Sequence, residues 1–283
     1  MARVHAAAMK YPDAVFVGES GAALRRLPVF GEPRDVHVVL PRPGSSRTIG
    51  GVRVHTVTGM PAFDEIGGVL VATAAEIAVD IARSRHHAIG LTVAGSALRA
   101  DRRLTTDTLI DLNARRASSR GRRHATWALE RASAVPESPL EHVSIAAIEW
   151  LGFPRPELQK WILGPDGHDD DRLDFWWEPW HAGGEADGFG KLGDNARAIA
   201  DALRRRGVRD ARLLARGVRA TAHWGWDEVV AVDPLRATLL AAGLPIVRPA
   251  DDMQLRSMRR AFTPTPGRGA VPASTRNDAP RQQ

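Results

Sequence analysis

The chain of 283 residues contains no cysteine. This absence excludes a disulfide framework, a thiolate zinc site, an iron–sulfur cluster and a cysteine nucleophile. No apolar run approaches the length of about 18 residues that a membrane-spanning helix needs, so none is expected. The first residues lack the apolar core of a signal peptide, and we expect a cytoplasmic protein. Neither a GxxxxGK[ST] phosphate loop nor a GxSxG nucleophile turn occurs.

The charges are unevenly distributed along the chain, whose net charge is +6. Residues 1–135 carry 19 Lys and Arg against 12 Asp and Glu, whereas residues 136–262 carry 17 against 20. A basic part favours phosphate partners, and an acidic part favours a cation. An arginine-rich solvated surface explains the same pattern equally well, so charge alone does not identify a partner.

The composition divides the chain into three parts. Residues 263–283 are rich in Pro, Gly, Ser, Thr and Arg without an apolar period, which predicts a disordered tail. A basic run ends at 123, and a strong helix start follows near 138. The boundary between the other two parts is therefore expected near 133–136, which gives domains over 1–135 and 136–262.

The sequence of the first part predicts a small sheet followed by helices, which is an α+β domain. Short or alternating apolar segments predict strands, and those at 35–40 and 52–57 flank a loop, as a hairpin or an adjacent pair would. A helical period of apolar residues begins at 73. The expected strands are 14–17, 35–40, 52–57 and 69–71, and the further helices are 19–27, 87–99, 105–116 and 122–133.

The second part predicts an α/β domain with a central mixed sheet flanked by helices. Ser138, Pro139 and Glu141 form a capping box with proline at its preferred position, so a helix is expected to begin there. The expected strands are 157–163, 172–177, a short segment ending at 185, and 218–224. The expected helices after them are 195–206, 209–216 and 234–242.

Two acidic residues are the first candidates for a catalytic site. Asp174 and Glu185 belong to neighbouring apolar segments. Adjacent carboxylates repel each other unless a cation or a proton intervenes, and Mg²⁺ binds one or two carboxylates together with water and phosphate oxygens. The two residues therefore predict a Mg²⁺ site for phosphodiester hydrolysis, with Lys191 supporting the developing negative charge. The alternative is structural, with Asp174 at a solvated strand edge and Asp187 in a turn.

Several short motifs, in this order and spacing, resemble a known family. They are ESPLE at 137–141, RLDFWW at 172–177, GEADG at 184–188 and WGWDE at 224–228. The motifs resemble the very-short-patch-repair-type endonuclease-like domain of the PD-(D/E)xK nuclease superfamily, which implies a restriction-endonuclease-like fold for the second part. Residues 15–131 resemble the middle region of actinobacterial AbiEi-type antitoxin-like proteins, which often join this region to the nuclease-like domain. That likeness is carried by the segments 20–42, 51–56 and 68–83.

The resemblance implies a role for each matching residue. Asp174 and Glu185 would be metal ligands on adjacent strands, and Glu141, with Glu137 as the second choice, the carboxylate from the preceding helix. Asp187 is a further candidate ligand. Lys191 would be a catalytic lysine. The superfamily usually has lysine where this chain has Asp187, and the paired histidines that often follow are missing. Glu141 also has a structural explanation, as the third residue of its capping box.

Arginine runs are the candidates for contact with nucleic acid. They are Arg122 and Arg123 at the start of one expected helix, and Arg204, Arg205 and Arg206 at the end of another. Arginine binds the phosphates of nucleic acids without regard to base sequence. Exposed helix ends explain the same runs equally well.

Three other features favour structural roles. The acidic segment 166–171 lacks the spacing of a calcium loop and is expected to be a solvated turn. His223 is expected to face outward from its strand. The strand tryptophans are expected in the core, because aromatic side chains bury large areas; Trp180 is left open.

Two functions of different classes remain possible. The first is a Mg²⁺-dependent DNA endonuclease. The second is a non-catalytic antitoxin or transcriptional regulator that keeps the nuclease fold to bind DNA or a cognate toxin, and a scaffold role is a third. The resembling proteins usually begin with a winged helix-turn-helix, whereas this chain begins with one short helical segment at 2–10, so that module is expected to be absent or to lie upstream. The oligomeric state does not follow from the residues.

Overall fold

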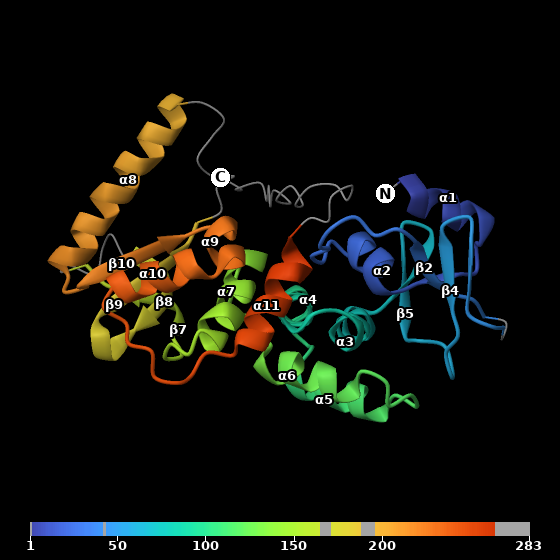
Figure 1. The fold of residues 1–283 in the computed structure, drawn as a ribbon. Helices are drawn as coiled ribbons and strands as arrows, with labels where there is room; N and C mark the ends of the chain where they lie inside the picture. The colour runs from blue at the N-terminus through green and yellow to red at the C-terminus, as the bar shows by residue number, and fades with distance from the viewer. Residues whose placement is uncertain (1, 42–43, 165–170, 188–195, 264–283) are drawn as a thin grey trace.

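The computed structural model describes residues 2–41, 44–164, 171–187 and 196–263. These residues form an α/β fold with two β-sheets, which confirms the predicted class. The sheets lie toward opposite ends of the molecule in Figure 1. Between them lie α3 (Ala74–Ser84), α4 (His87–Ala100), α7 (Pro139–Trp150) and α11 (Asp252–Phe262). No described helix is long and apolar enough to cross a membrane.

The first sheet is built from β1 (Val15–Phe16), β2 (Val36–Val39), β3 (Arg47–Ile49), β4 (Val52–His55), β5 (Phe63–Ile66) and β6 (Val69–Ala72). Their order across the sheet is β3-β4-β2-β1-β6-β5. The four predicted strands are confirmed. Strands β2 and β4 are parallel neighbours, because β3 lies between them in sequence and pairs with the outer side of β4. The predictions omit β3 and β5 because their side chains are mostly exposed and carry no apolar alternation.

Helices cover this sheet and continue away from it. They are α1 (Ala2–Lys10), α2 (Gly18–Leu24), α3, α4, α5 (Thr106–Arg115) and α6 (Arg122–Arg131). The predicted helices of the first part are confirmed. Threonine hydroxyls cap two of them: Thr73 accepts from the backbone N–H of Glu76 in α3, and Thr105 accepts from that of Thr108 in α5.

The second sheet is built from β7 (Glu157–Ile162), β8 (Asp171–Trp177), β9 (Ala182–Ala186) and β10 (Ala220–Trp224), in the order β10-β9-β8-β7. Strands β7, β8 and β9 are antiparallel, whereas β9 and β10 are parallel, so the sheet is mixed as predicted. A 3-10 turn (Glu178–Trp180) joins β8 to β9. Two helices after β10, α9 (Trp226–Ala231) and α10 (Asp233–Ala241), complete this part with α11.

Helix α7 begins as its capping box predicts. The hydroxyl of Ser138 accepts from the backbone N–H of Glu141 at 3.2 Å, and Pro139 is the first helical residue. The side chain of Glu141 reaches back to the backbone N–H of Glu137, one residue before the cap. Two N–H groups at the start of the helix are thereby satisfied by local contacts alone.

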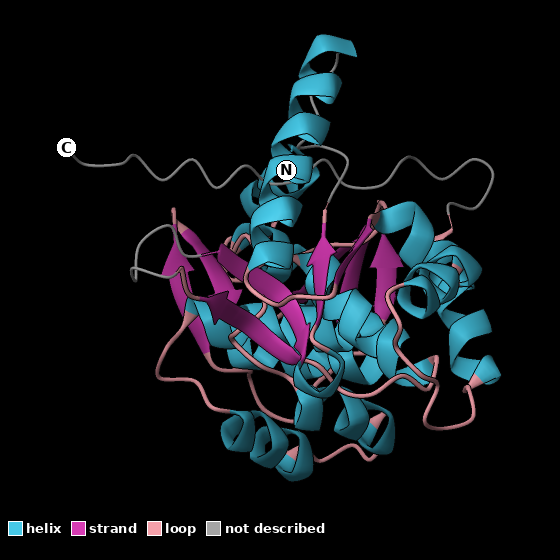
Figure 2. Cartoon of the chain, turned by 90° about the vertical axis from the view of Figure 1, so that its left-hand side faces the viewer, coloured by secondary structure: helices cyan, strands magenta, loops and turns pink. Residues whose placement is uncertain are grey.

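Helix α8 (Ala196–Ala215) is one continuous helix. The prediction of two helices, at 195–206 and 209–216, is therefore wrong. Gly207 lies in the gap between the two expected helices, but a single glycine costs an α-helix only about 1 kcal/mol relative to alanine, which packing can offset. The N-terminal turns of α8 extend well away from the sheets, as Figure 2 shows.

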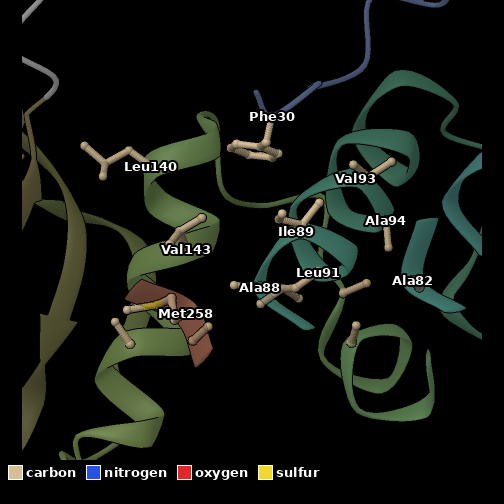
Figure 3. Packing of buried hydrophobic residues seen from close by; sticks show 14 of the residues in the cluster. Phe30, Ala82, Ala88, Ile89, Leu91, Val93, Ala94, Leu140, Val143 and Met258 are labelled. Atoms are coloured by element: carbon tan, nitrogen blue, oxygen red, sulfur yellow. The ribbon is translucent and has the colours of Figure 1, made fainter. Parts of the chain in front are cut away.

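One hydrophobic cluster extends from the first sheet to the second. Where α4 faces α7, Ile89 and Val143 contribute to this cluster, and Met258 of α11 lies beside α7 (Figure 3). Gly95 allows α4 and α7 to approach closely, since a Cβ atom there would lie 2.1 Å from Nε2 of His142. The core thus crosses the boundary expected near 133–136, and the division into two domains stays a prediction. Apart from Thr263, the predicted tail lies outside the described residues.

Three histidines gather where α3 meets α4 and α6. The rings of His87 and His124 stack with their centroids 4.0 Å apart, and His86 meets the edge of Trp150 at 5.5 Å. Burial lowers the pKa of His86 to about 4, and the charges of His87 and His124 act in the same direction. Burial and the charge of His124 likewise lower the pKa of His87 to about 4. Both rings are therefore neutral at neutral pH.

We expect acid to destabilise the fold through His86 and His87. Their pKa in the folded protein lies below the ordinary value of 6.5, so the unfolded chain binds protons first as the pH falls. The stabilisation is complete above about pH 6.5 and is lost toward pH 4. The free energy of unfolding should fall by about 2 kcal/mol for the two residues together. This is less than the two pKa shifts alone would give, because solvent screens part of each shift. Urea unfolding between neutral pH and pH 4 measures it.

The double variant His86→Gln, His87→Gln is the control for this prediction. Its free energy of unfolding should fall less steeply over the same pH range, because these two groups no longer titrate. A fall as steep as in the wild type would show that other groups carry the acid dependence.

Candidate functional site

A row of polar residues crosses all four strands of the second sheet. The strand registers align Gln159 of β7, Asp174 of β8, Glu185 of β9 and His223 of β10. As expected, Asp174 and Glu185 lie on adjacent strands. On β8, hydrophobic residues that are completely buried precede and follow this row. The row therefore places polar side chains beside the core, where each needs a partner.

The amide of Gln159 joins two carboxylates. Its Nε2 donates to Oε2 of Glu141 at 2.8 Å and to Oδ1 of Asp174 at 3.1 Å. Oδ2 of Asp174 accepts from the backbone N–H of Ala186 at 3.0 Å. Oε2 of Glu141 also accepts from the backbone N–H of Glu137 at 2.9 Å. Glu141 therefore closes the start of α7, as its structural interpretation predicts, and it also contacts the polar row through Gln159.

Gln159 is the member of this site that the sequence did not reveal. Its φ is +55°, a left-handed conformation that is unusual within a strand and that clusters at functional sites. Its Oε1 is buried and accepts no hydrogen bond from any described residue. Because Nε2 lies between two carboxylates, the orientation of the amide is determined. A single glutamine within a short strand pattern gives no signal by which sequence reasoning could have found it.

Glu185 is deeply buried, with 7% of its side chain exposed. Its Oε1 forms an ion pair with Nη2 of Arg209 at 2.9 Å, without the geometry of a hydrogen bond. The pKa of Glu185 is raised to about 7, chiefly by burial and then by the charge of Asp174, against the opposing charge of Arg209. A second cation at this carboxylate would favour its charged form.

His223 is held between two carboxylates. Its Nδ1 lies 3.0 Å from Oδ2 of Asp187, and its Nε2 lies 3.1 Å from the carboxylate of Asp210 in α8. Burial lowers the pKa of His223, but the hydrogen bond to Asp187 and the charge of Asp210 outweigh it and raise the pKa. Arg206 of α8 donates to the same Oδ2 of Asp187 at 2.7 Å. The expectation that His223 faces outward is wrong, because residues of α8 pack against it.

Asp171 lies among three arginines. Arg209, Arg212 and Arg216 approach its carboxylate at 3.3, 2.9 and 3.0 Å. Burial raises the pKa of Asp171, but the arginines, with Arg212 first, outweigh burial and hold that pKa below its ordinary value. The expected solvated turn at 166–171 is therefore wrong for Asp171, whereas 166–170 lie outside the described residues. Arg209, Arg212 and Arg216 are three and four residues apart in α8. Their side chains therefore lie on one side of the helix and surround Asp171 together.

The arginines expected to contact nucleic acid have different surroundings. Arg123, Arg204 and Arg205 are exposed. Arg122 and Arg206 are half-buried and donate hydrogen bonds within the protein. The first three therefore present their charge to solvent, while the other two contribute to internal structure.

Three of the four tryptophans in the strands of the second sheet belong to the core, as predicted, whereas Trp161 of β7 is exposed. Trp176, Trp177 and Trp224 are buried. The indole N–H of Trp224 donates to the hydroxyl of Ser144 in α7 at 2.8 Å, which ties the helix to the sheet. Trp180 is half-buried and packs against the same core.

The predicted metal ligands fall into two groups. Glu141 joins Asp174 through the amide of Gln159, and Glu185 is close enough to Asp174 for the two charges to repel. Asp187 belongs instead to the group around His223. Lys191, the predicted catalytic lysine, lies outside the described residues.

The side chains around Asp174 could hold a divalent cation only if further ligands, such as water, completed its coordination shell. Oε1 of Gln159 is a buried acceptor without a donor among the described residues, which water or a cation would satisfy, whereas Oε1 of Glu185 already contacts the guanidinium of Arg209. The described part of the chain contains no group of three or more His, Cys, Asp or Glu side chains that could hold a metal ion. Mg²⁺ needs only one or two carboxylates when water and phosphate oxygens complete its shell. The described residues therefore supply at most part of a coordination shell for Mg²⁺.

Comparison of the chain with protein-family models, with curated proteins and with solved structures finds no match. The resemblance of its short motifs to two families stays a prediction. The arguments about function below therefore depend on the geometry of the site.

We expect Asp171→Asn to lower the free energy of unfolding by about 2 kcal/mol. Three guanidiniums would lose their shared counter-ion, and their partial exposure keeps the effect below the usual cost of breaking a buried ion pair. Denaturant unfolding measures this change. Asp201→Asn is the matched control, because its ion pair with Arg204 is exposed and should contribute within about 0.5 kcal/mol. Equal effects of the two substitutions would contradict a central role for Asp171.

Proposed function

We propose that the second part of the chain is a Mg²⁺-dependent DNA endonuclease domain with a restriction-endonuclease-like fold. The observation that carries this proposal is Oε1 of Gln159, a buried acceptor in the polar row of Asp174 and Glu185 that lacks a donor among the described residues. An unsatisfied acceptor beside two carboxylates indicates a position for a cation. The order of the nuclease-like motifs supports the same function.

In this proposal, Asp174, Glu185, Glu141 and Gln159 have distinct tasks. Asp174 and Glu185 would hold the cation, while Glu141 acts through the amide of Gln159 as a positioning residue. The backbone N–H of Ala186 fixes the second oxygen of Asp174. A bound Mg²⁺ would polarise the phosphate and lower the pKa of a water molecule. The residues themselves hold the carboxylates in place before any ligand enters.

DNA is the proposed substrate, and α8 is the proposed contact surface. Arg204 and Arg205 are exposed on α8, a helix whose N-terminal turns extend from the sheet (Figure 2). The same helix reaches the polar row through Arg206 and Arg209. Phosphates bound along α8 would therefore lie close to the site.

A non-catalytic antitoxin or transcriptional regulator is the second candidate. The ion pair between Arg209 and Glu185 favours it, because a guanidinium already compensates the carboxylate that a metal would need. Asp187, which stands where the superfamily usually has lysine, is bound by Arg206 and His223. In this case the fold would bind DNA or a cognate toxin without cleavage. A cytoplasmic location stays a prediction for both candidates.

We expect the purified protein to nick supercoiled plasmid DNA with Mg²⁺ or Mn²⁺ and to lose this activity with a chelator. Asp174→Asn should abolish nicking, because the amide keeps the shape and removes the charge that the cation needs. Gln159→Ala should reduce nicking, since it releases two carboxylates from their common donor. Asp107→Asn, an exposed position in α5, is the control and should leave the rate unchanged. A wild-type protein that binds DNA and never nicks it would favour the non-catalytic candidate.

DNA binding should weaken steeply as the salt concentration rises, because each phosphate contact releases counter-ions. We expect the double variant Arg204→Gln, Arg205→Gln to reduce the slope of log affinity against log salt by about 0.9 for each lost contact. Fluorescence anisotropy with a duplex oligonucleotide measures the slope, and Arg123→Gln tests the first part of the chain in the same way. No binding at low salt to duplex or single-stranded DNA would contradict both candidates that involve nucleic acid.

A further inference from the structure

Arg209 connects the polar row to the arginine cluster around Asp171. Its guanidinium lies 2.9 Å from Oε1 of Glu185 and 3.3 Å from Oδ1 of Asp171, and it donates to the backbone carbonyl of Arg172 at 2.6 Å. Both carboxylates are deeply buried. One side chain of α8 thus compensates negative charge on two neighbouring strands.

The two carboxylates depend on Arg209 to different degrees. Asp171 keeps two other guanidiniums, those of Arg212 and Arg216. For Glu185, Arg209 is the only cationic partner among the described residues. If Arg209 moved away, Asp171 would stay paired, whereas Glu185 would become a buried negative charge that another cation must compensate.

The position of Arg209 on α8 gives it access to other anions. Its side chain is 30% exposed. Arg205 lies one helical turn earlier and is exposed. Residues four apart on a helix are neighbours about 6 Å apart, so a phosphate bound at Arg205 would lie within reach of the guanidinium of Arg209.

We propose that Arg209 is a displaceable internal counter-ion, which holds Glu185 until the phosphates of a nucleic acid draw it away and a divalent cation replaces it. The charge of Glu185 stays compensated when the cation takes the place of Arg209. The two binding events are therefore coupled: bound nucleic acid increases the affinity for the metal, and bound metal increases the affinity for nucleic acid. This inference rests on the proposed function. It makes the metal site dependent on the presence of the substrate.

The binding of Mn²⁺, measured by loss of the free-ion electron paramagnetic resonance signal, tests the coupling without relying on activity. Without DNA, Arg209→Gln should bind Mn²⁺ roughly tenfold more tightly than the wild type, because an adjacent positive charge has been removed. Arg209→Lys keeps that charge and should remain near the wild type. Arg212→Gln is the matched control: it removes an arginine that pairs with Asp171, where Arg209 and Arg216 remain, and it should not change the affinity for Mn²⁺.

Addition of a duplex oligonucleotide should increase the Mn²⁺ affinity of the wild type and leave that of Arg209→Gln nearly unchanged. Introducing Asp174→Asn into Arg209→Gln should remove the bound Mn²⁺, which locates the ion. Should Arg209→Gln fail to fold, the wild type still decides, because no gain in Mn²⁺ affinity on adding DNA overturns the inference.

The outcomes separate this inference from the proposed function. Equal Mn²⁺ affinity of the wild type and Arg209→Gln without DNA would overturn the role of Arg209 and leave the metal site standing. No Mn²⁺ binding by any variant, with or without DNA, would overturn the proposed function and the inference together.

Discussion

Carboxylates buried in the second sheet need positive partners, and this requirement organises the second part of the molecule. Asp171 and Glu185 are both buried, and arginines of α8 pair with each of them. An uncompensated charge at such positions would cost several kcal/mol. Helix α8 is continuous through Gly207, since Arg206 and Arg209 on either side of that glycine both bind acids of the sheet. The ion pairs therefore position α8 and give the site its charge balance.

Where α7 meets the sheet, a neutral hydrogen-bond donor contacts the carboxylates in place of an arginine. Two carboxylates, those of Glu141 and Asp174, lie on either side of Gln159, whose two amide hydrogens serve one each. This arrangement keeps the carboxylates close through a neutral amide, and it uses a left-handed backbone conformation at Gln159. The amide leaves an acceptor oxygen without a described partner. On its α8 side the charge of Glu185 is compensated by Arg209, whereas on its α7 side the donor between the carboxylates is the neutral amide of Gln159.

The core determines how the site is supported. Helix α7 carries Glu141, bonds to Trp224 through Ser144, and packs closely on α4 at Gly95. A hydrophobic cluster that includes both helices therefore connects the site to the first sheet. Stability changes in either half should be transmitted to the other through this contact, because closely packed interiors have little room to adjust.

The sequence by itself determined the elements whose signals are local. The start of α7 follows from Ser138 and Pro139, because capping involves only neighbouring residues, and the alternation of apolar residues predicts most strands. Exposed strands such as β3 and β5 carry no such alternation. The tertiary structure alone decided that Asp171 is buried, that His223 faces α8 and that Gln159 joins two carboxylates. Each of these depends on contacts between residues distant in the chain, which the periodicity of a single segment does not encode.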